Sequence, residues 1–85
     1  MKLFLVSQNH NNNYDTFDSF VCAAKNENQA KNISPYGKYI NWEKINEFDS
    51  SSWVDKKDKI NVKYIGEASP EYTKRQIICA SFNAG

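Results

Sequence analysis

Two cysteines and one histidine are the side chains in this sequence that could carry nucleophilic chemistry. A cysteine next to a histidine acts as a nucleophile when the imidazole can take the thiol proton. Cys22 and Cys79 each stand in an apolar, strand-like stretch, where burial suppresses thiol reactivity, and His10 stands in a polar loop. We therefore predict two reduced, buried thiols that pack as small hydrophobic side chains.

The other residue patterns required for catalysis or cofactor binding are missing from the sequence. His10 is the only histidine, and the cysteines and carboxylates lack metal-ligand spacing, so we predict no metal and no cofactor. Asp15 and Asp18 are three residues apart in a stretch that reads as extended, which points them to opposite faces. No glycine-rich phosphate loop is present. The sequence predicts a protein that is not an enzyme.

A short basic stretch beside an aromatic residue is the nearest approach to a nucleic-acid site. Lysines close to a tryptophan can hold single-stranded nucleic acid through phosphate contacts and base stacking. Asp55 and Asp58 interrupt the stretch, so direct nucleic-acid binding is only an alternative hypothesis. Its candidate residues are Lys56, Lys57, Lys59 and Lys63, with Trp53 to stack on a base.

The middle of the chain is rich in aromatic residues. Tryptophans of a small domain most often belong to the core, but tyrosine and tryptophan also anchor protein–protein interfaces. The sequence leaves both roles open for the segment from Tyr36 to Trp53. The candidate partner-binding residues are Tyr39, Trp42, Phe48, Trp53, Phe82 and Asn83.

Four strands and one short helix must position these residues. Asn26 is a favourable helix N-cap with Gln29 three residues later, and Pro35 ends the helix, whose Ala30 and Ile33 should face a sheet. The segment from Tyr36 to Trp53 is a packed loop or holds a second short helix. Apolar residues and alternation predict strands over Lys2–Gln8, Tyr14–Ala24, Ile60–Glu67 and Ile77–Phe82.

Length and composition limit the architecture to one small domain. The chain has 85 residues, a net charge of +1 and 40% hydrophobic residues, which is too apolar for a disordered chain and too neutral for a general nucleic-acid binder. We predict a single α+β domain over residues 1–85, with a mainly antiparallel sheet and the helix on one face. No apolar run could span a membrane, and the start lacks a secretory signal, so we expect a cytoplasmic protein.

Several segments resemble a family of small phage and prokaryotic proteins. The resemblance rests on the start Met1–Ser7, the stretch Tyr14–Val21 and the ending Ala80–Gly85, with Ala23–Glu27 and Ile65–Ala68 between them. It covers most of the chain except residues 36–59. It implies a phage or mobile-element setting, and no particular activity.

Small phage proteins without catalytic motifs include inhibitors of bacterial defence systems, such as anti-CRISPR proteins. The resemblance therefore implies an accessory protein that binds a host protein, such as a defence nuclease complex, in the host cytoplasm. The alternatives are an oligomer that sequesters a small ligand or nucleotide, and a single-stranded nucleic-acid-binding module.

Overall fold

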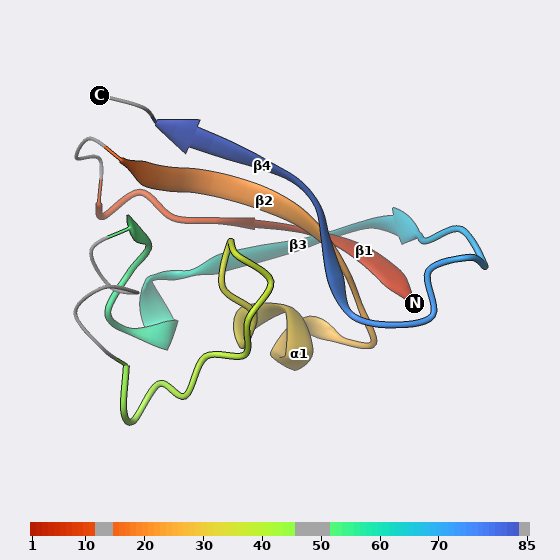
Figure 1. Cartoon of the computed structure of the whole chain (residues 1–85), viewed down its shortest axis with the longest axis horizontal. Helices are drawn as coiled ribbons and strands as arrows, with labels where there is room; N and C mark the ends of the chain where they lie inside the picture. Colours follow the sequence, from red (N-terminus) through yellow and green to blue (C-terminus); the bar gives the residue numbers. More distant parts are fainter. Residues whose placement is uncertain (12–14, 46–51, 84–85) are drawn as a thin grey trace.

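A computed structural model describes residues 1–11, 15–45 and 52–83, and of Asn83 only its place in a strand. The predicted α+β class and the predicted order of elements are confirmed (Figure 1). Within the described residues, no helix is long and apolar enough to cross a membrane. The elements are β1 (Lys2–Ser7), β2 (Thr16–Ala24), α1 (Glu27–Lys31), the 3-10 turn η1 (Lys57–Lys59), β3 (Asn61–Glu67) and β4 (Gln76–Asn83).

The four strands form one antiparallel sheet in the order β3-β1-β2-β4. β1 and β2 form a central hairpin, in which Phe4 lies opposite Cys22 and Val6 opposite Phe20. β3 pairs with β1, and β4 pairs with β2, so the last two strands form the two edges of the sheet. β1 and β2 are therefore the two central strands of the sheet.

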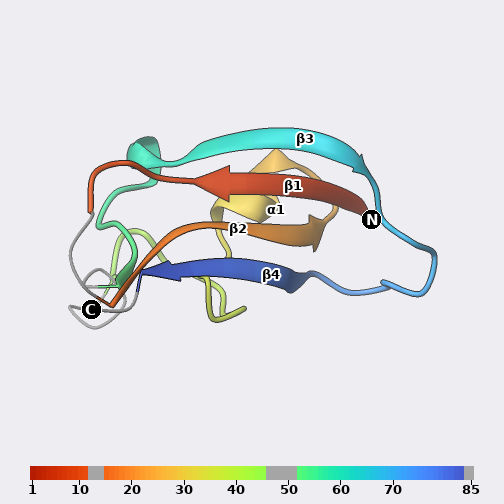
Figure 2. The ribbon, with the colours of Figure 1, turned by 90° about the horizontal axis from the view of Figure 1, so that it is seen from above.

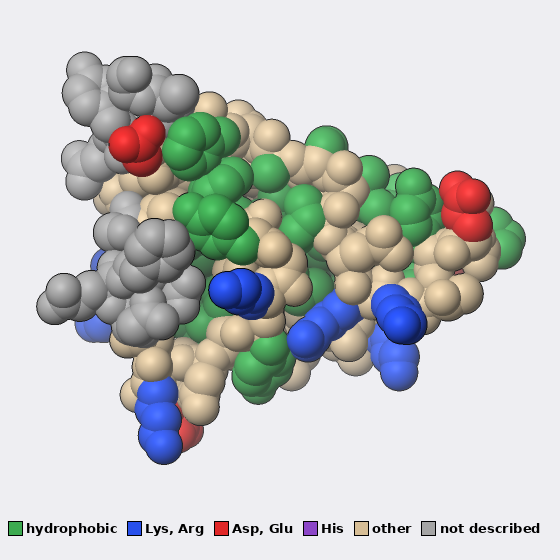
Figure 3. Space-filling model, in the orientation of Figure 1, with side chains coloured by type: hydrophobic (Ala, Val, Ile, Leu, Met, Phe, Trp, Pro, Cys, Tyr) green, Lys and Arg blue, Asp and Glu red, His purple; other side chains and the backbone are tan. Residues whose placement is uncertain are grey.

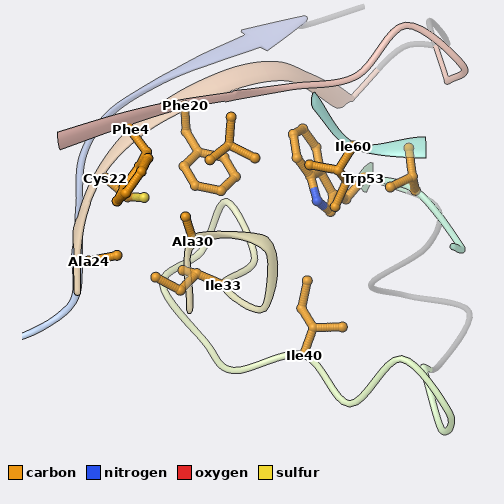
Figure 4. Close-up of a cluster of buried hydrophobic side chains, with 11 residues drawn as sticks. Phe4, Phe20, Cys22, Ala24, Ala30, Ile33, Ile40, Trp53 and Ile60 are labelled. Atoms are coloured by element: carbon orange, nitrogen blue, oxygen red, sulfur yellow. The ribbon is translucent and has the colours of Figure 1, made fainter. Parts of the chain in front are cut away.

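The core lies between the sheet and the segment that connects β2 to β3 (Figure 4). Phe4 and Val6 from β1 point into it with Phe20 and Cys22 from β2. α1 and the residues after it supply the opposite side of this single hydrophobic layer. Those opposing residues are Ala30, Ile33, Ile40, Trp53, Val54 and Ile60.

The α1 helix begins as its sequence predicts. The Asn26 side-chain oxygen accepts a hydrogen bond from the backbone N–H of Gln29, 2.8 Å away. The Gln29 side chain in turn accepts one from the backbone N–H of Lys25, 2.7 Å away. The first bond satisfies a backbone donor that a helix start leaves unpaired, and the second holds the residue before the cap. Ala30 and Ile33 are fully buried, as predicted, but α1 ends at Lys31 with Asn32 as its C-cap, so Ile33 lies beyond the helix and the prediction that Pro35 ends it is wrong.

The second face of the sheet carries no described segment (Figure 2, where α1 lies behind β1 and β2). Phe4 and Val6 point into the core, so Leu3 and Leu5 point to the opposite face, because successive side chains of a strand alternate. Both leucines are only partly buried. The sheet therefore packs on one side only, and its edges and open face remain available for contacts.

Candidate functional site

Exposed aromatic side chains gather along the β4 edge of the sheet. Tyr36 is 47% exposed, Tyr39 61% and Phe82 46%. Arg75, which directly precedes β4, lies over the Tyr39 ring, with its Cζ atom 5.5 Å from the ring centroid. We call Tyr36, Tyr39, Arg75 and Phe82 together the aromatic surface.

Ring contacts connect one half of the aromatic surface to the core. Phe17 of β2 lies opposite Phe82 of β4, and their ring centroids are 4.7 Å apart. The Phe17 ring also meets Tyr36 edge to face at 5.2 Å. Because Phe17 itself packs against the core, Tyr36 and Phe82 are held from beneath while their outer faces remain exposed.

A tight loop between two buried isoleucines holds the tyrosines of this surface. Ile33 and Ile40 are both buried, and the backbone N–H of Ile40 donates to the carbonyl of Asn32 at 2.7 Å. Between them, the Ser34 hydroxyl oxygen accepts hydrogen bonds from the backbone N–H groups of Tyr36 and Lys38. The loop therefore projects Tyr36 and Tyr39 from a fixed base.

Gly37 makes the turn of this loop possible. Its φ of +88° lies in the left-handed region, which a residue with a Cβ atom enters only at a cost. Its N–H donates to the carbonyl of Ser34 at 2.8 Å. The residues Ser34-Pro35-Tyr36-Gly37 thus form a turn that directs the Tyr36 side chain toward solvent.

Figure 3 looks at this side of the molecule. Hydrophobic side chains lie along and beneath the left half of β4, where the strand ends. Basic side chains lie at the centre, right and lower left of the view, and acidic side chains lie at the upper left and at the far right. Tyrosine, phenylalanine and arginine on one exposed patch are the composition typical of a protein–protein interface.

The structure separates the predicted partner-binding residues. Tyr39 and Phe82 belong to the aromatic surface. Trp42 is partly buried, and its indole Nε1 donates to the Asn32 side-chain oxygen at 3.0 Å. Trp53 is 1% exposed and packs on Phe20 with ring centroids 5.3 Å apart, so its ring offers a partner no accessible face. Phe48 and the side chain of Asn83 lie outside the described residues.

Sequence reasoning missed Tyr36 and Arg75. The turn signal Pro35-Tyr36-Gly37 could have marked Tyr36, because a residue between proline and glycine in a surface turn is directed outward. Arg75 carries no local signal. It reaches Tyr39 only because β4 runs beside the loop after α1.

The two thiols have different environments. Cys22 is buried, as predicted, and burial raises the pKa of its thiol to about 11. The prediction that Cys79 is also buried is wrong, because the edge position of β4 leaves this residue exposed. Both cysteines are free thiols. In the part of the chain that the structure describes, no cluster of metal-ligating side chains forms.

The lysines of the nucleic-acid hypothesis do not form one surface with an accessible aromatic ring. The Lys57 ammonium donates to the side-chain oxygen of Asn28, and the Lys59 ammonium pairs with the Asp55 carboxylate, each at 2.7 Å. Lys63 lies opposite Leu5 and so shares the open face of the sheet. Lys56 is exposed next to the 3-10 turn, and Trp53, the residue meant for stacking, is buried.

An open cleft of about 410 Å³ lies between β1, β3 and the start of α1. The Tyr64 hydroxyl beside it donates to the Glu67 carboxylate at 2.5 Å, which raises the pKa of Tyr64. This cleft is a feature that relates to the small-ligand alternative. Its lining residues are Lys2, Phe4, Asn26, Glu27, Asn28 and Tyr64.

Comparison with known proteins identifies no relative of this chain. No protein-family model, no curated protein and no solved structure matches this chain. The resemblance to small phage proteins therefore stays a prediction from the sequence, and the candidate site is defined by the geometry of this chain.

Proposed function

We propose that this chain acts by binding a partner protein through the aromatic surface rather than by catalysis. The observation that carries the proposal is that Tyr36, Tyr39 and Phe82 are all exposed along β4, with Tyr36 and Phe82 against Phe17 and with Arg75 over Tyr39. Aromatic and arginine side chains supply most of the binding energy at protein interfaces, because they bury large areas with few rotatable bonds.

The fixed base of the patch favours the same function. Phe17 supports two of the aromatic rings, and buried isoleucines hold the loop that carries the tyrosines. A side chain that is already ordered loses little conformational entropy when a partner covers it. The aromatic surface is therefore suited to tight binding despite its small size.

The biological setting of the proposal comes from the sequence resemblance alone. We propose a phage or mobile-element accessory protein that acts in the host cytoplasm. Its partner would be a host protein, and its effect would be to inhibit a bacterial defence system such as CRISPR–Cas. Inhibition of this kind requires a surface that blocks or distorts the partner, and it requires no catalytic group in the inhibitor.

The first experiment compares three tagged proteins in bacterial lysates with CRISPR–Cas systems, namely the natural chain, Tyr39→Ser and Tyr64→Ser. Tyr64 is a matched control, because it is 50% exposed and lies on β3, at the opposite edge of the sheet. Each capture is run with and without nuclease and is read by mass spectrometry. The captured protein is then purified and titrated with each variant.

We expect one protein that the natural chain and Tyr64→Ser capture equally and that survives nuclease. Tyr39→Ser should weaken its binding at least tenfold, which corresponds to the loss of about 1.4 kcal/mol. Capture that nuclease abolishes would instead support nucleic-acid binding. Equal binding by all three proteins would exclude the aromatic surface as the interface.

A second readout tests the inhibitor role. Phage plating is compared in a strain with its defence system intact and in the same strain with that system deleted. We expect the natural chain to raise plating only where the system is present, and Tyr39→Ser to lose this effect. An equal effect in both strains would contradict inhibition of defence while leaving partner binding intact.

A further inference from the structure

The outer edge of β4 is an unprotected strand edge. Within the described sheet β4 pairs with β2 alone, and every residue from Ile78 to Phe82 is exposed. Exposure of consecutive residues means that neither face of this part of the strand is covered, since consecutive side chains point to opposite faces. From Cys79 to Asn83, β4 pairs with β2 and has no bulged residue.

The two edges of the sheet differ in the devices that prevent pairing. Natural edge strands are usually blocked by charged side chains, prolines or bulges. β3 has such devices, because it carries Lys63 and Glu67 and an irregularity where Ile65 is left without a partner on β1. β4 has one such irregularity, where Ile78 is left without a partner on β2, but from Gln76 to Asn83 it has no charged residue and no proline. The outer edge of β4 therefore presents an accessible row of backbone hydrogen-bond donors and acceptors.

The charges at the two ends of β4 determine which kind of strand can pair with its outer edge. Lys74 and Arg75 precede the strand and are exposed, so its beginning is basic, with Glu71 in the turn before them. Its end lies beside acidic residues of β2. Thr16, which follows the exposed Asp15, pairs with Asn83, and the Asp18 carboxylate accepts a hydrogen bond from the Ser81 hydroxyl at 3.3 Å. The edge is therefore basic at one end and acidic at the other.

We propose that β4 pairs with β4 of a second copy of this chain in an antiparallel, two-fold arrangement. A copy turned end for end brings Lys74 and Arg75 of each chain toward Asp15 of the other, which lies just before Thr16 at the end of β4. The neutral strands between them meet without like-charge repulsion. Parallel pairing would place like charges together at both ends. The result is one continuous eight-stranded sheet, in which the β3 strands of the two copies form the outer edges.

This pairing goes beyond the proposed partner binding. It would bring the two aromatic surfaces next to each other on the helix-covered side of the joined sheet, because Phe82 lies within the paired segment. The dimer would then present a partner with a two-fold pair of binding patches. Arg75 and Phe82 belong to both surfaces, whereas Tyr39 lies outside β4 and Ala80 lies outside the aromatic surface, so substitutions at Tyr39 and Ala80 test the two proposals separately.

The mass in solution tests the pairing, measured by sedimentation equilibrium across a hundredfold range of protein concentration. We expect a reversible dimer. Ala80→Lys places a charge on the exposed edge and should raise the dissociation constant at least tenfold. Ile65→Lys is the control, because Ile65 is an exposed apolar residue of β3 and its substitution should leave the dimer unchanged.

Charge exchange tests the orientation of the pair. One variant combines Lys74→Glu with Arg75→Glu, and the other combines Asp15→Lys with Asp18→Lys. Each variant alone should be monomeric, because both ends of its edge carry the same sign. An equimolar mixture should restore dimers that contain one chain of each kind, measured by native mass spectrometry.

Cross-linking gives an independent measure of the same contact. In an antiparallel pair centred between Cys79 and Ser81, the two Cys79 Cα atoms lie on the order of 15 Å apart or less. A bis-maleimide of that reach should join the natural chains, and Cys79→Ser should abolish the product, because Cys22 is buried.

Three outcomes would overturn the proposal. The first is a monomer over the whole concentration range. The second is a dimer that Ile65→Lys disrupts and Ala80→Lys does not, which would place the contact at β3. The third is that β4 pairs only with a strand of the partner protein captured above and not with a second copy of this chain.

Loss of partner binding in Tyr39→Ser with an intact dimer would show that dimerisation and partner binding are independent.

Discussion

Cys22 and Cys79 lie on neighbouring antiparallel strands, and their thiols point to opposite faces of the sheet. Val21, the residue before Cys22, is the register partner of Cys79 on the open face. Cys22 points into the core. The two thiols are therefore close along the sheet but separated by its backbone, which keeps both free.

This arrangement predicts two thiols of very different reactivity. A maleimide or aromatic disulfide reagent at neutral pH should modify one thiol per chain rapidly, and the second only after unfolding. Cys79→Ser should abolish the rapid phase, and Cys22→Ala should retain it. The readout is mass spectrometry over time with and without denaturant. Rapid modification of both thiols in the folded protein would contradict the burial of Cys22.

Burial of Cys22 also predicts a loss of stability at alkaline pH. The pKa of the thiol is raised from 9.0 to about 11 in the folded chain. Above pH 9 the unfolded chain loses this proton while the folded chain retains it, so the free energy of unfolding falls as pH rises toward 11. Below pH 9 both states hold the proton, and the group has no effect.

The measurement is urea unfolding of the natural chain and of Cys22→Ala from pH 8 to pH 10.5. Lysines and tyrosines titrate in both proteins, so only the difference between the two curves reports on Cys22. We expect the natural chain to lose about 1 kcal/mol more than the variant over this range. Parallel curves would show that the thiol is accessible to solvent in the folded chain.

The two tryptophans should differ in their contribution to stability. Trp53 is buried against Phe20, so Trp53→Ala should cost about 3–5 kcal/mol in the free energy of unfolding. Trp42→Ala should cost less than half as much, because its ring is only partly buried.

Phenylalanine substitutions separate packing from hydrogen bonding at these two positions. Among the described residues, the Trp53 Nε1 atom has no hydrogen-bond partner, whereas the Trp42 Nε1 atom donates to Asn32. Trp53→Phe should therefore lose packing alone, and Trp42→Phe should also lose a hydrogen bond. Circular dichroism in urea measures all four variants. A Trp53→Ala protein as stable as the natural chain would place this ring outside the core.

The N-cap of α1 should contribute measurably although the helix is short. Asn26→Ala removes the hydrogen bond to the Gln29 N–H and should cost about 1 kcal/mol in the free energy of unfolding. Asn26→Ser is the control, because a serine hydroxyl can accept the same bond. Thermal and urea unfolding give the values. Equal loss in both variants would attribute the effect to contacts other than the cap.

Local sequence signals were sufficient where neighbouring residues decide the structure. Asn26 and Gln29 fix the start of α1 through a cap that reaches only a few residues, whereas the helix ends at Lys31, earlier than the predicted end at Pro35. Apolar runs and alternation likewise indicate the strands, because one face of each strand must be buried. The α+β class and the order of elements follow from these short-range rules.

The position of each strand in the sheet is not a local property. Cys79 and Cys22 stand in similar apolar stretches, and only the strand order makes one an edge residue and the other a core residue. Trp53 and Tyr39 both belong to the aromatic middle of the sequence, yet Trp53 fills the core, whereas Tyr39 is the most exposed large hydrophobic side chain among the described residues.

The sequence by itself determined the four strands, the start of the short helix, the order of these elements and the absence of the common catalytic motifs, because these depend on residue types and short spacings. The tertiary structure alone decided which aromatic residues form a surface and which strand edge remains open. Those features depend on long-range pairing, such as Phe17 opposite Phe82 and Arg75 over Tyr39, which joins residues far apart in the chain and leaves no mark in the local pattern.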